Sequence, residues 1–143
     1  MKDFDLILFD LDGTLTRSDP GILRCIRETM KKLNVPEPPA ETMRKFIGPP
    51  LTLSIREYCG ITGEKAMEFV EEYRSIYNVK GVFEAEVFDG MFPLLKKLRK
   101  AGYKLALATS KPQSSANLVS DHFGITPYLD TVSGASEDEN DTK

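Results

Sequence analysis

Two aspartates near the amino terminus, Asp10 and Asp12, have a type and spacing that can support chemistry. They follow the apolar run Leu6–Phe9 directly, and an unpaired carboxylate costs much free energy to bury. In an extended chain, side chains two residues apart point to the same side. Two oxygen donors held together suit Mg²⁺, which takes one or two carboxylates together with water and phosphate oxygens. The pattern therefore predicts a Mg²⁺ site with Asp10 and Asp12 as the metal ligands.

The apolar run before these aspartates predicts the element that positions them. An unbroken rather than alternating run is typical of a strand covered on both faces of a parallel sheet. Gly13 permits a sharp turn straight after the carboxylates. The alternative is an ordinary hairpin, for which Asp-Gly is a common turn. A hairpin explains Gly13 but gives no reason for Asp10.

After this strand the predicted secondary structure changes from an α/β pattern to helices alone, and later back to an α/β pattern. Leu23, Ile26 and Met30 recur at helical spacing, and helical patterns continue to about Val79. Both flanking segments have α/β patterns, which marks a domain boundary on each side. We therefore predict an α/β core made of residues 1–17 and 80–143, with residues 18–79 as a separate helical domain.

A second strand, Tyr103–Ala108, ends at Thr109, Ser110 and Lys111. Because ligands bind at the carboxyl ends of parallel strands, these residues should lie close to Asp10 and Asp12. A helix beginning after Ser110 would offer free backbone N–H groups to an anion, and Lys111 adds positive charge. The alternative is that Thr109 and Ser110 are a plain helix cap.

Composition excludes several classes of partner. The 143 residues carry a formal net charge of −3, which leaves no basic surface for nucleic acid. No apolar run approaches the roughly 20 residues of a membrane-spanning helix. Cys25 and Cys59 lack metal-ligand spacing and are expected to be reduced thiols of a cytoplasmic protein.

The segment Asp10-Leu-Asp-Gly-Thr-Leu15 resembles the first motif of the haloacid dehalogenase-like phosphohydrolases, in particular the phosphoglycolate phosphatase-like members with a small helical cap. The resemblance implies a Rossmann-like parallel sheet, here incomplete with about three strands. It also implies that residues 18–79 are the helical cap inserted into this core.

The resemblance further implies a mechanism and its residues. Asp10 would attack phosphorus and form an aspartyl-phosphate, and Asp12 would act as the general acid and base. Thr109 would hold the transferring phosphoryl group, with backbone donors from Leu11 and Ser110. Mg²⁺ would be the cofactor, and the partner would be a small phosphorylated metabolite.

The family's phosphate-binding lysine matches Lys143, with Lys111 as an alternative cation. In the cap, Arg44, Gly48 and Pro49 resemble the segment that faces the substrate in relatives. The alternative for Arg44 is an exposed helix charge.

The family's fourth motif, a Gly-Asp…Asp segment after a further strand, has no match in this sequence. We therefore expect the chain to be a fragment of a phosphatase, weakly active or inactive alone. The phosphate ester and the oligomeric state stay open. Alternatives are a 5'-nucleotidase or pyrophosphatase of the same family, or a non-catalytic interaction or signalling fragment.

Overall fold

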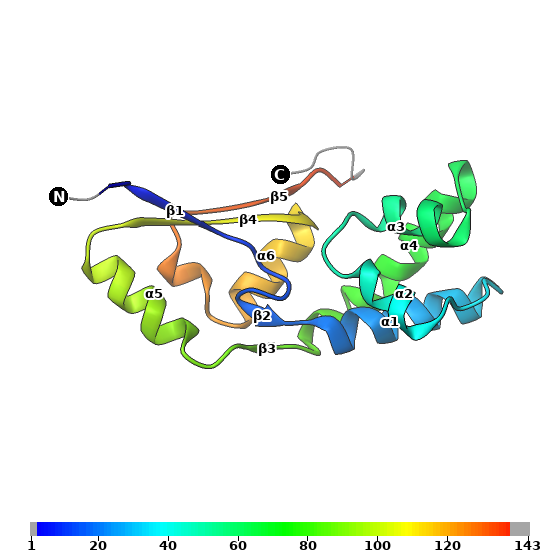
Figure 1. Ribbon diagram of the computed structural model, residues 1–143, viewed down its shortest axis with the longest axis horizontal. Coiled ribbons are helices and arrows are strands. Elements are labelled where there is room, and N and C mark those ends of the chain that lie inside the picture. The colour runs from blue at the N-terminus through cyan, green and yellow to red at the C-terminus, as the bar shows by residue number, and fades with distance from the viewer. Residues whose placement is uncertain (1–2, 138–143) are drawn as a thin grey trace. The chain divides into compact units, whose positions relative to one another are not determined.

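The computed structural model describes residues 3–137, and the chain divides into two compact units (Figure 1). The core unit combines the chain up to Arg17 with the chain from Glu86 onward, and the helical unit is Ser18–Ala85. The second boundary lies at Ala85 rather than at the predicted Val79. The reason is that the short 3₁₀ helix η2, Gly81–Phe83, packs against the first helix of the helical unit.

Three parallel strands form the sheet of the core unit, in the order β1-β4-β5. The helices α5 and α6 connect the later strands, and both lie against the same face of this sheet (Figure 1). A parallel sheet with helical crossovers confirms the predicted α/β fold. The bounds are β1 Leu6–Phe9, α5 Met91–Lys100, β4 Lys104–Pro112, α6 Gln113–His122, the 3₁₀ helix η3 Thr126–Tyr128 and β5 Thr131–Ala135.

The prediction that β1 is covered on both faces is wrong. Leu6 and Leu8 are 48% and 62% exposed, while the alternate residues Ile7 and Phe9 are half-buried. The strand is at the edge of the sheet, and α5 and α6 cover only the other face. Alternate residues of this apolar strand are therefore exposed, because within residues 3–137 no helix covers one face of β1.

The two later strands differ from their predicted bounds. β4 continues past its predicted end at Ala108 to Pro112. The sequence also predicts a short third strand over Tyr128–Val132, whereas β5 spans Thr131–Ala135. The helix α6 consequently begins at Gln113, with Pro112 as its N-cap residue. The plain helix cap considered for Thr109 and Ser110 is therefore wrong, since both residues belong to the strand.

A second, two-stranded sheet lies within the core unit. β2, Thr16–Arg17, pairs antiparallel with β3, Glu86–Val87. Arg17 donates to Glu86 over 3.1 Å, and both side chains are largely exposed. An exposed ion pair contributes little stability, so the backbone ladder that pairs Thr16 with Val87 and Arg17 with Glu86 fixes this sheet.

The helical unit contains four α-helices and two 3₁₀ helices within the described residues. Its largest packed pair is α1 against α4, and Met30, Ile55 and Phe69 are among its fully buried side chains. Burial of such apolar side chains is the main favourable term in folding. The bounds are α1 Asp19–Lys32, α2 Ala40–Met43, η1 Arg44–Phe46, α3 Leu51–Cys59, α4 Gly63–Tyr77 and η2 Gly81–Phe83.

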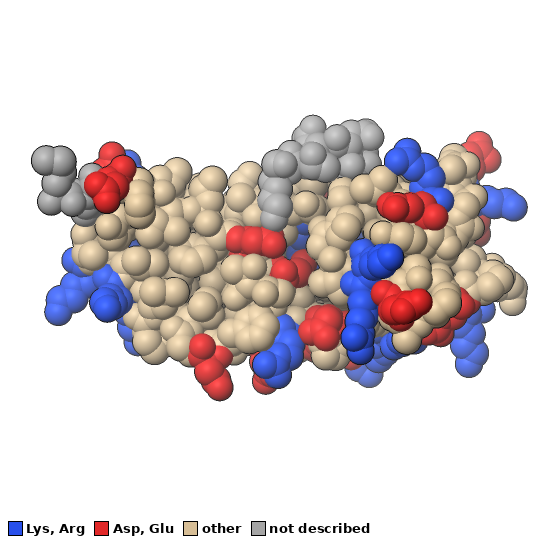
Figure 2. Space-filling view, in the orientation of Figure 1, with Lys and Arg blue, Asp and Glu red and all other residues tan. Residues whose placement is uncertain are grey.

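Acidic and basic side chains are interspersed over the surface of the helical unit (Figure 2). Several of them pair, among them Arg24 with Glu84 and Lys32 with Glu72. Across residues 3–137 no helix has the length and apolar character needed to span a membrane.

The carboxylate of Asp130 ties the start of β5 to β4. It accepts hydrogen bonds from the Leu105 backbone N–H at 2.8 Å and from the Arg99 guanidinium at 2.5 Å. The backbone donor, assisted by Arg99, lowers the pKa of Asp130 below its ordinary value. A lowered pKa means that the carboxylate stabilises the fold above about pH 4, and that this contribution is lost as the pH falls further.

We expect Asp130→Asn to be less stable than the wild type at neutral pH and to lose less stability on acidification. Urea unfolding at a series of pH values measures both effects. Asp89→Asn, a change at an exposed position of the same unit, is the matched control. Equal pH dependence of the Asp130 variant and the wild type would contradict the assigned role.

Candidate active site

The two aspartates lie at the start of a tight turn after β1. The carbonyl of Leu11 accepts the backbone N–H groups of Thr14, Leu15 and Thr16, at 3.1, 3.0 and 3.2 Å. Gly13 has a φ of +80°, a conformation that side chains disfavour. The antiparallel hairpin alternative is wrong, because β1 pairs in parallel with β4.

An ion pair joins this turn to β4. The Lys111 ammonium lies 3.2 Å from Oδ2 of Asp12, and the two side chains are only 6% and 11% exposed. Asp10 follows Phe9, which pairs with Leu107 of β4, and is itself half-buried. The first and second predicted site segments, far apart in sequence, therefore meet at the carboxyl end of the parallel sheet.

The backbone of β4 bulges at Thr109–Lys111. Ala108 pairs with Ser133 and Pro112 with Ala135, so these three residues face the single Gly134. Such bulges re-aim side chains and are frequent beside active sites. The buried hydroxyl of Thr109 accepts the Lys111 backbone N–H at 3.1 Å. With its oxygen engaged as an acceptor, the hydroxyl hydrogen of Thr109 is available to donate to an anion.

A side-chain amide restores the ladder where the bulge interrupts it. Gln113 accepts the Gly134 N–H at 2.7 Å and donates to the Val132 carbonyl at 3.1 Å. It thereby replaces the strand backbone opposite β5. The sequence analysis did not single out Gln113 or Gly134. The available signal was a glycine inside a strand, which indicates a bulge or a close backbone approach.

Gly134 permits that approach. A Cβ at this position would lie 2.7 Å from the Lys111 carbonyl oxygen and 2.8 Å from the Gln113 backbone nitrogen. Both atoms are backbone and cannot rotate away. We therefore expect Gly134→Ala to shift the bulge, to lower the free energy of unfolding by about 1–3 kcal/mol and to reduce any activity of the site.

Chemical denaturation of Gly134→Ala beside Ser133→Ala, at the exposed preceding position of β5, tests this expectation. An alanine tolerated at residue 134 as well as at residue 133 would show that the close approach is not required.

The sequence predicts that a helix beginning after Ser110 offers its free backbone N–H groups to an anion. The structure does not form this site at the expected residues. The helix α6 begins three residues later, at Gln113. The carboxylate of Glu137 accepts the backbone N–H and the hydroxyl of Ser114, both at 3.0 Å. The Glu137 carboxylate is thus an anion at this helix terminus.

Of the remaining predicted site residues, three belong to the helical unit and one lies outside residues 3–137. Arg44, Gly48 and Pro49 are exposed on the helical unit, and Gly48 turns the chain with a φ of +106°. Lys143 lies outside the described residues. The roles predicted for these four residues stay predictions.

The carboxylates provide a limited metal site. Within residues 3–137 no group of three or more His, Cys, Asp or Glu side chains could hold a metal ion. One oxygen of Asp12 already faces Lys111. Asp10 and Asp12 therefore fit a Mg²⁺ ion that completes its shell with water and a phosphate, and not a cation held by protein groups alone.

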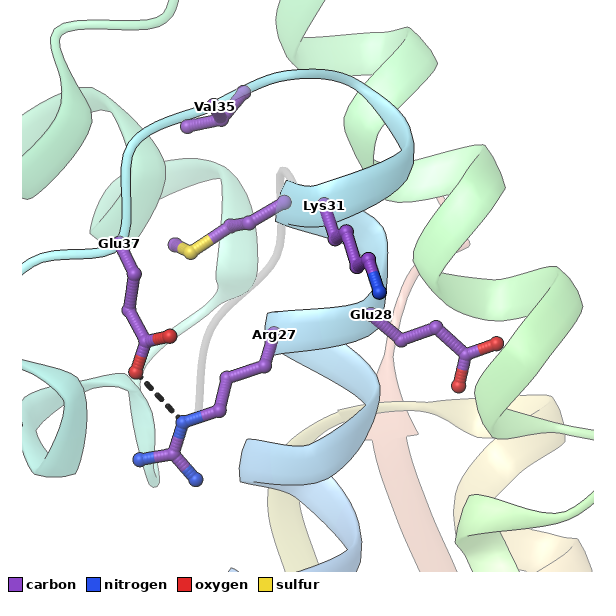
Figure 3. A pocket seen from close by; sticks show the side chains of 6 residues that line it. Arg27, Glu28, Lys31, Val35 and Glu37 are labelled. Atoms are coloured by element: carbon purple, nitrogen blue, oxygen red, sulfur yellow. Dashed lines mark hydrogen bonds and ion pairs between the residues drawn. The ribbon is translucent and has the colours of Figure 1, made fainter.

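A pocket of about 400 Å³ lies in the helical unit, beside the carboxyl-terminal half of α1 (Figure 3). Arg27 donates to Glu37 across it over 2.7 Å. The other lining residues are Glu28, Met30, Lys31 and Val35. None of the predicted site residues lines this pocket, and its charges are paired or solvent-facing, so the candidate active site remains that of the core unit.

A family model described as haloacid dehalogenase-like hydrolase matches residues 7–143. The chain belongs to this family. The match includes the segment Asp10–Leu15, which carried the resemblance in the sequence, and the residues Thr109–Lys111 of the bulge.

Among curated relatives, the haloacid dehalogenase-like chain is 40% identical over 133 residues to the tyrosine-protein kinase PtkA of Mycobacterium tuberculosis. It is 38% identical over 132 residues to a 5'-nucleotidase of Pseudomonas aeruginosa. These alignments cover 93% and 92% of the chain but only 45% and 60% of the relatives. The chain thus spans less than two thirds of either relative.

Solved structures agree with the fold. A predicted phosphatase from Clostridium acetobutylicum aligns with a TM-score of 0.90 at 36% identity, over 96% of this chain and 63% of that one. A predicted phosphoglycolate phosphatase from Haemophilus somnus aligns with a TM-score of 0.81 at 26% identity, over 94% and 64%. The predicted membership in this family and its Rossmann-like fold are confirmed.

Proposed function

We propose that the protein hydrolyses a small phosphate monoester through an aspartyl-phosphate on Asp10. The observation that carries this proposal is the contact between the Asp12 turn and the Thr109–Lys111 bulge. The two segments are joined by the 3.2 Å ion pair between Lys111 and Asp12. Asp10, Asp12 and the Thr109 hydroxyl lie at the carboxyl end of this sheet, which supports the roles proposed for them as nucleophile, acid–base group and hydrogen-bond donor. Membership in a hydrolase family with relatives named as phosphatases supports it.

In the first step, a carboxylate oxygen of Asp10 bonds to phosphorus as the ester P–O bond breaks. The leaving alkoxide takes a proton from Asp12. In the second step, water attacks the phosphorus, Asp12 takes back a proton, and the bond between Asp10 and phosphorus breaks. Thr109 donates its hydroxyl hydrogen to the phosphoryl oxygens throughout.

Mg²⁺ is the cofactor that suits this site. Asp10 and Asp12 would hold it, and its positive charge would offset the repulsion between an anionic nucleophile and an anionic phosphate. We expect chelation to remove activity and Mg²⁺ to restore it. A cytoplasmic location agrees with the two free thiols, Cys25 and Cys59.

Two classes of phosphate monoester are candidates for the substrate, and transfer to a tyrosine hydroxyl is a third candidate reaction. Phosphoglycolate-like esters are one, supported by the Haemophilus somnus relative. Nucleoside monophosphates are the other, supported by the Pseudomonas aeruginosa relative, which is named a 5'-nucleotidase. The name of PtkA adds a third possibility, in which a tyrosine hydroxyl takes part in phosphoryl transfer.

A screen of the full-length protein against phosphate monoesters tests the proposal. Phosphoglycolate, nucleoside monophosphates and sugar phosphates are assayed for phosphate release with Mg²⁺ and with a chelator. A parallel reaction with ATP and a tyrosine peptide tests for transfer to tyrosine. Release of phosphate from at least one ester is expected. Transfer to the peptide without hydrolysis of any ester would refute the proposal.

A further inference from the structure

Lys111 makes two contacts, one to each of two proposed catalytic residues. Its backbone N–H donates to the Thr109 hydroxyl oxygen at 3.1 Å, and its ammonium lies 3.2 Å from Oδ2 of Asp12. The same residue therefore fixes the direction of the hydroxyl and the orientation of the carboxylate. The sequence suggested a different task, namely direct attraction of the substrate phosphate.

Burial of both side chains stabilises the ion pair between the Lys111 ammonium and the Asp12 carboxylate in one arrangement. The side chains of Lys111 and Asp12 are 6% and 11% exposed. An exposed ion pair exchanges freely with water, whereas a buried charge whose partner is removed becomes strongly unfavourable. Asp12 lies on the turn after β1, and its carboxylate is held by the Lys111 ammonium of β4.

Lys111 is itself anchored from the opposite strand. Its carbonyl oxygen lies against Gly134, where only the absence of a Cβ leaves room. The neighbouring Gln113 is bonded on both sides of Gly134, to the N–H of that residue and to the Val132 carbonyl. These contacts fix the backbone of the bulge at Lys111. A fixed backbone suits a residue whose role is to hold other side chains in position.

We propose that Lys111 is a positioning residue that holds Asp12 for proton transfer while its backbone orients Thr109, and that it is not the lysine that binds the substrate phosphate. This inference rests on the proposed function. A positioning role predicts that loss of the ammonium slows turnover through Asp12, whereas a phosphate-binding role predicts weaker binding of substrate and of inorganic phosphate.

A double-mutant cycle on the full-length protein distinguishes the two roles. Lys111→Met, Asp12→Asn and the double variant are compared with the wild type, with Lys104→Met on the exposed start of β4 as the control. We expect Lys111→Met to lower kcat by about 10–100-fold, the range for loss of a supporting partner of an active-site ligand. KM and the affinity for inorganic phosphate, measured by calorimetry, should change little.

The decisive comparison is between Asp12→Asn and the double variant. If Lys111 acts through Asp12, both should have the same residual kcat. A further fall in kcat, a raised KM or weakened phosphate binding in the double variant would overturn the inference. Asp12→Asn keeps an amide oxygen that can accept from the Lys111 ammonium, and the double variant removes both charges of the buried pair. The comparison therefore decides the matter even if Lys111→Met alone fails to fold.

Two other outcomes are separable. Wild-type activity that Lys111→Met leaves unchanged would overturn the inference and leave the proposed function standing. A wild type that releases phosphate from no ester would refute the proposed function, and the positioning role would fall with it.

Discussion

Replacing Asp10 by asparagine is expected to lower phosphate-ester turnover by at least about 10⁴-fold, the scale seen when a covalent nucleophile is removed. An amide oxygen is a poor nucleophile, so no aspartyl-phosphate can form and general acid catalysis by Asp12 has no covalent step to assist. The side chain is half-buried and asparagine has nearly the same shape. The fold should therefore be retained, and steady-state kinetics beside circular dichroism measures both properties.

Asp89→Asn is the matched control, because it makes the same chemical change at an exposed position of the core unit. Its turnover should equal that of the wild type. If Asp10→Asn kept more than a small fraction of the activity, the nucleophile would have to be another residue, and the mechanism argued from the Asp12 turn would be wrong.

Truncation of Phe69 is expected to have the largest effect on stability, a loss of about 3–5 kcal/mol in the free energy of unfolding. Phe69 lies on α4, is completely buried, and is one of the largest side chains in the helical unit. Alanine at this position removes the transfer free energy of the ring and leaves a cavity among α1 and α4. Urea denaturation followed by far-ultraviolet circular dichroism gives the change.

Met67→Ala on the same helix is the control, since Met67 is 47% exposed. Its stability should stay close to that of the wild type, because little apolar area returns to water. Similar losses for the two variants would mean that the helical unit is not held together by the core described for it.

The class of fold was predictable because strong local signals agreed. Three segments have an apolar spacing or length that fits only one kind of element. These are the strand Leu6–Phe9, the helices within residues 18–79 and the second strand. The meeting of Asp12 with Thr109–Lys111 followed from a topological rule, since ligand sites lie at the carboxyl ends of parallel strands. That rule requires only the order of the elements.

The features that were predicted wrongly or not at all depend on tertiary contacts. The exposure of Leu6 and Leu8 is decided by which elements cover the sheet, and an apolar run contains no information about that. The bulge of β4 depends on a glycine in another strand and on the amide of Gln113. The ion pair between Lys111 and Asp12 joins residues 99 positions apart. A pattern in either segment therefore indicates the charged residues but not that they pair.

Trapping of a phosphoenzyme tests the central claim most directly. The full-length protein is mixed with a radiolabelled ester substrate, quenched in acid within the first turnovers, digested and analysed by mass spectrometry. We predict a phosphoryl group on the peptide that carries Asp10, absent in Asp10→Asn. Because it is bound as an acyl-phosphate, hydroxylamine should cleave it, releasing inorganic phosphate and leaving a hydroxamate on Asp10. A labelled phosphate bound to a serine, threonine or histidine instead, with Asp10 unmodified, would contradict the account.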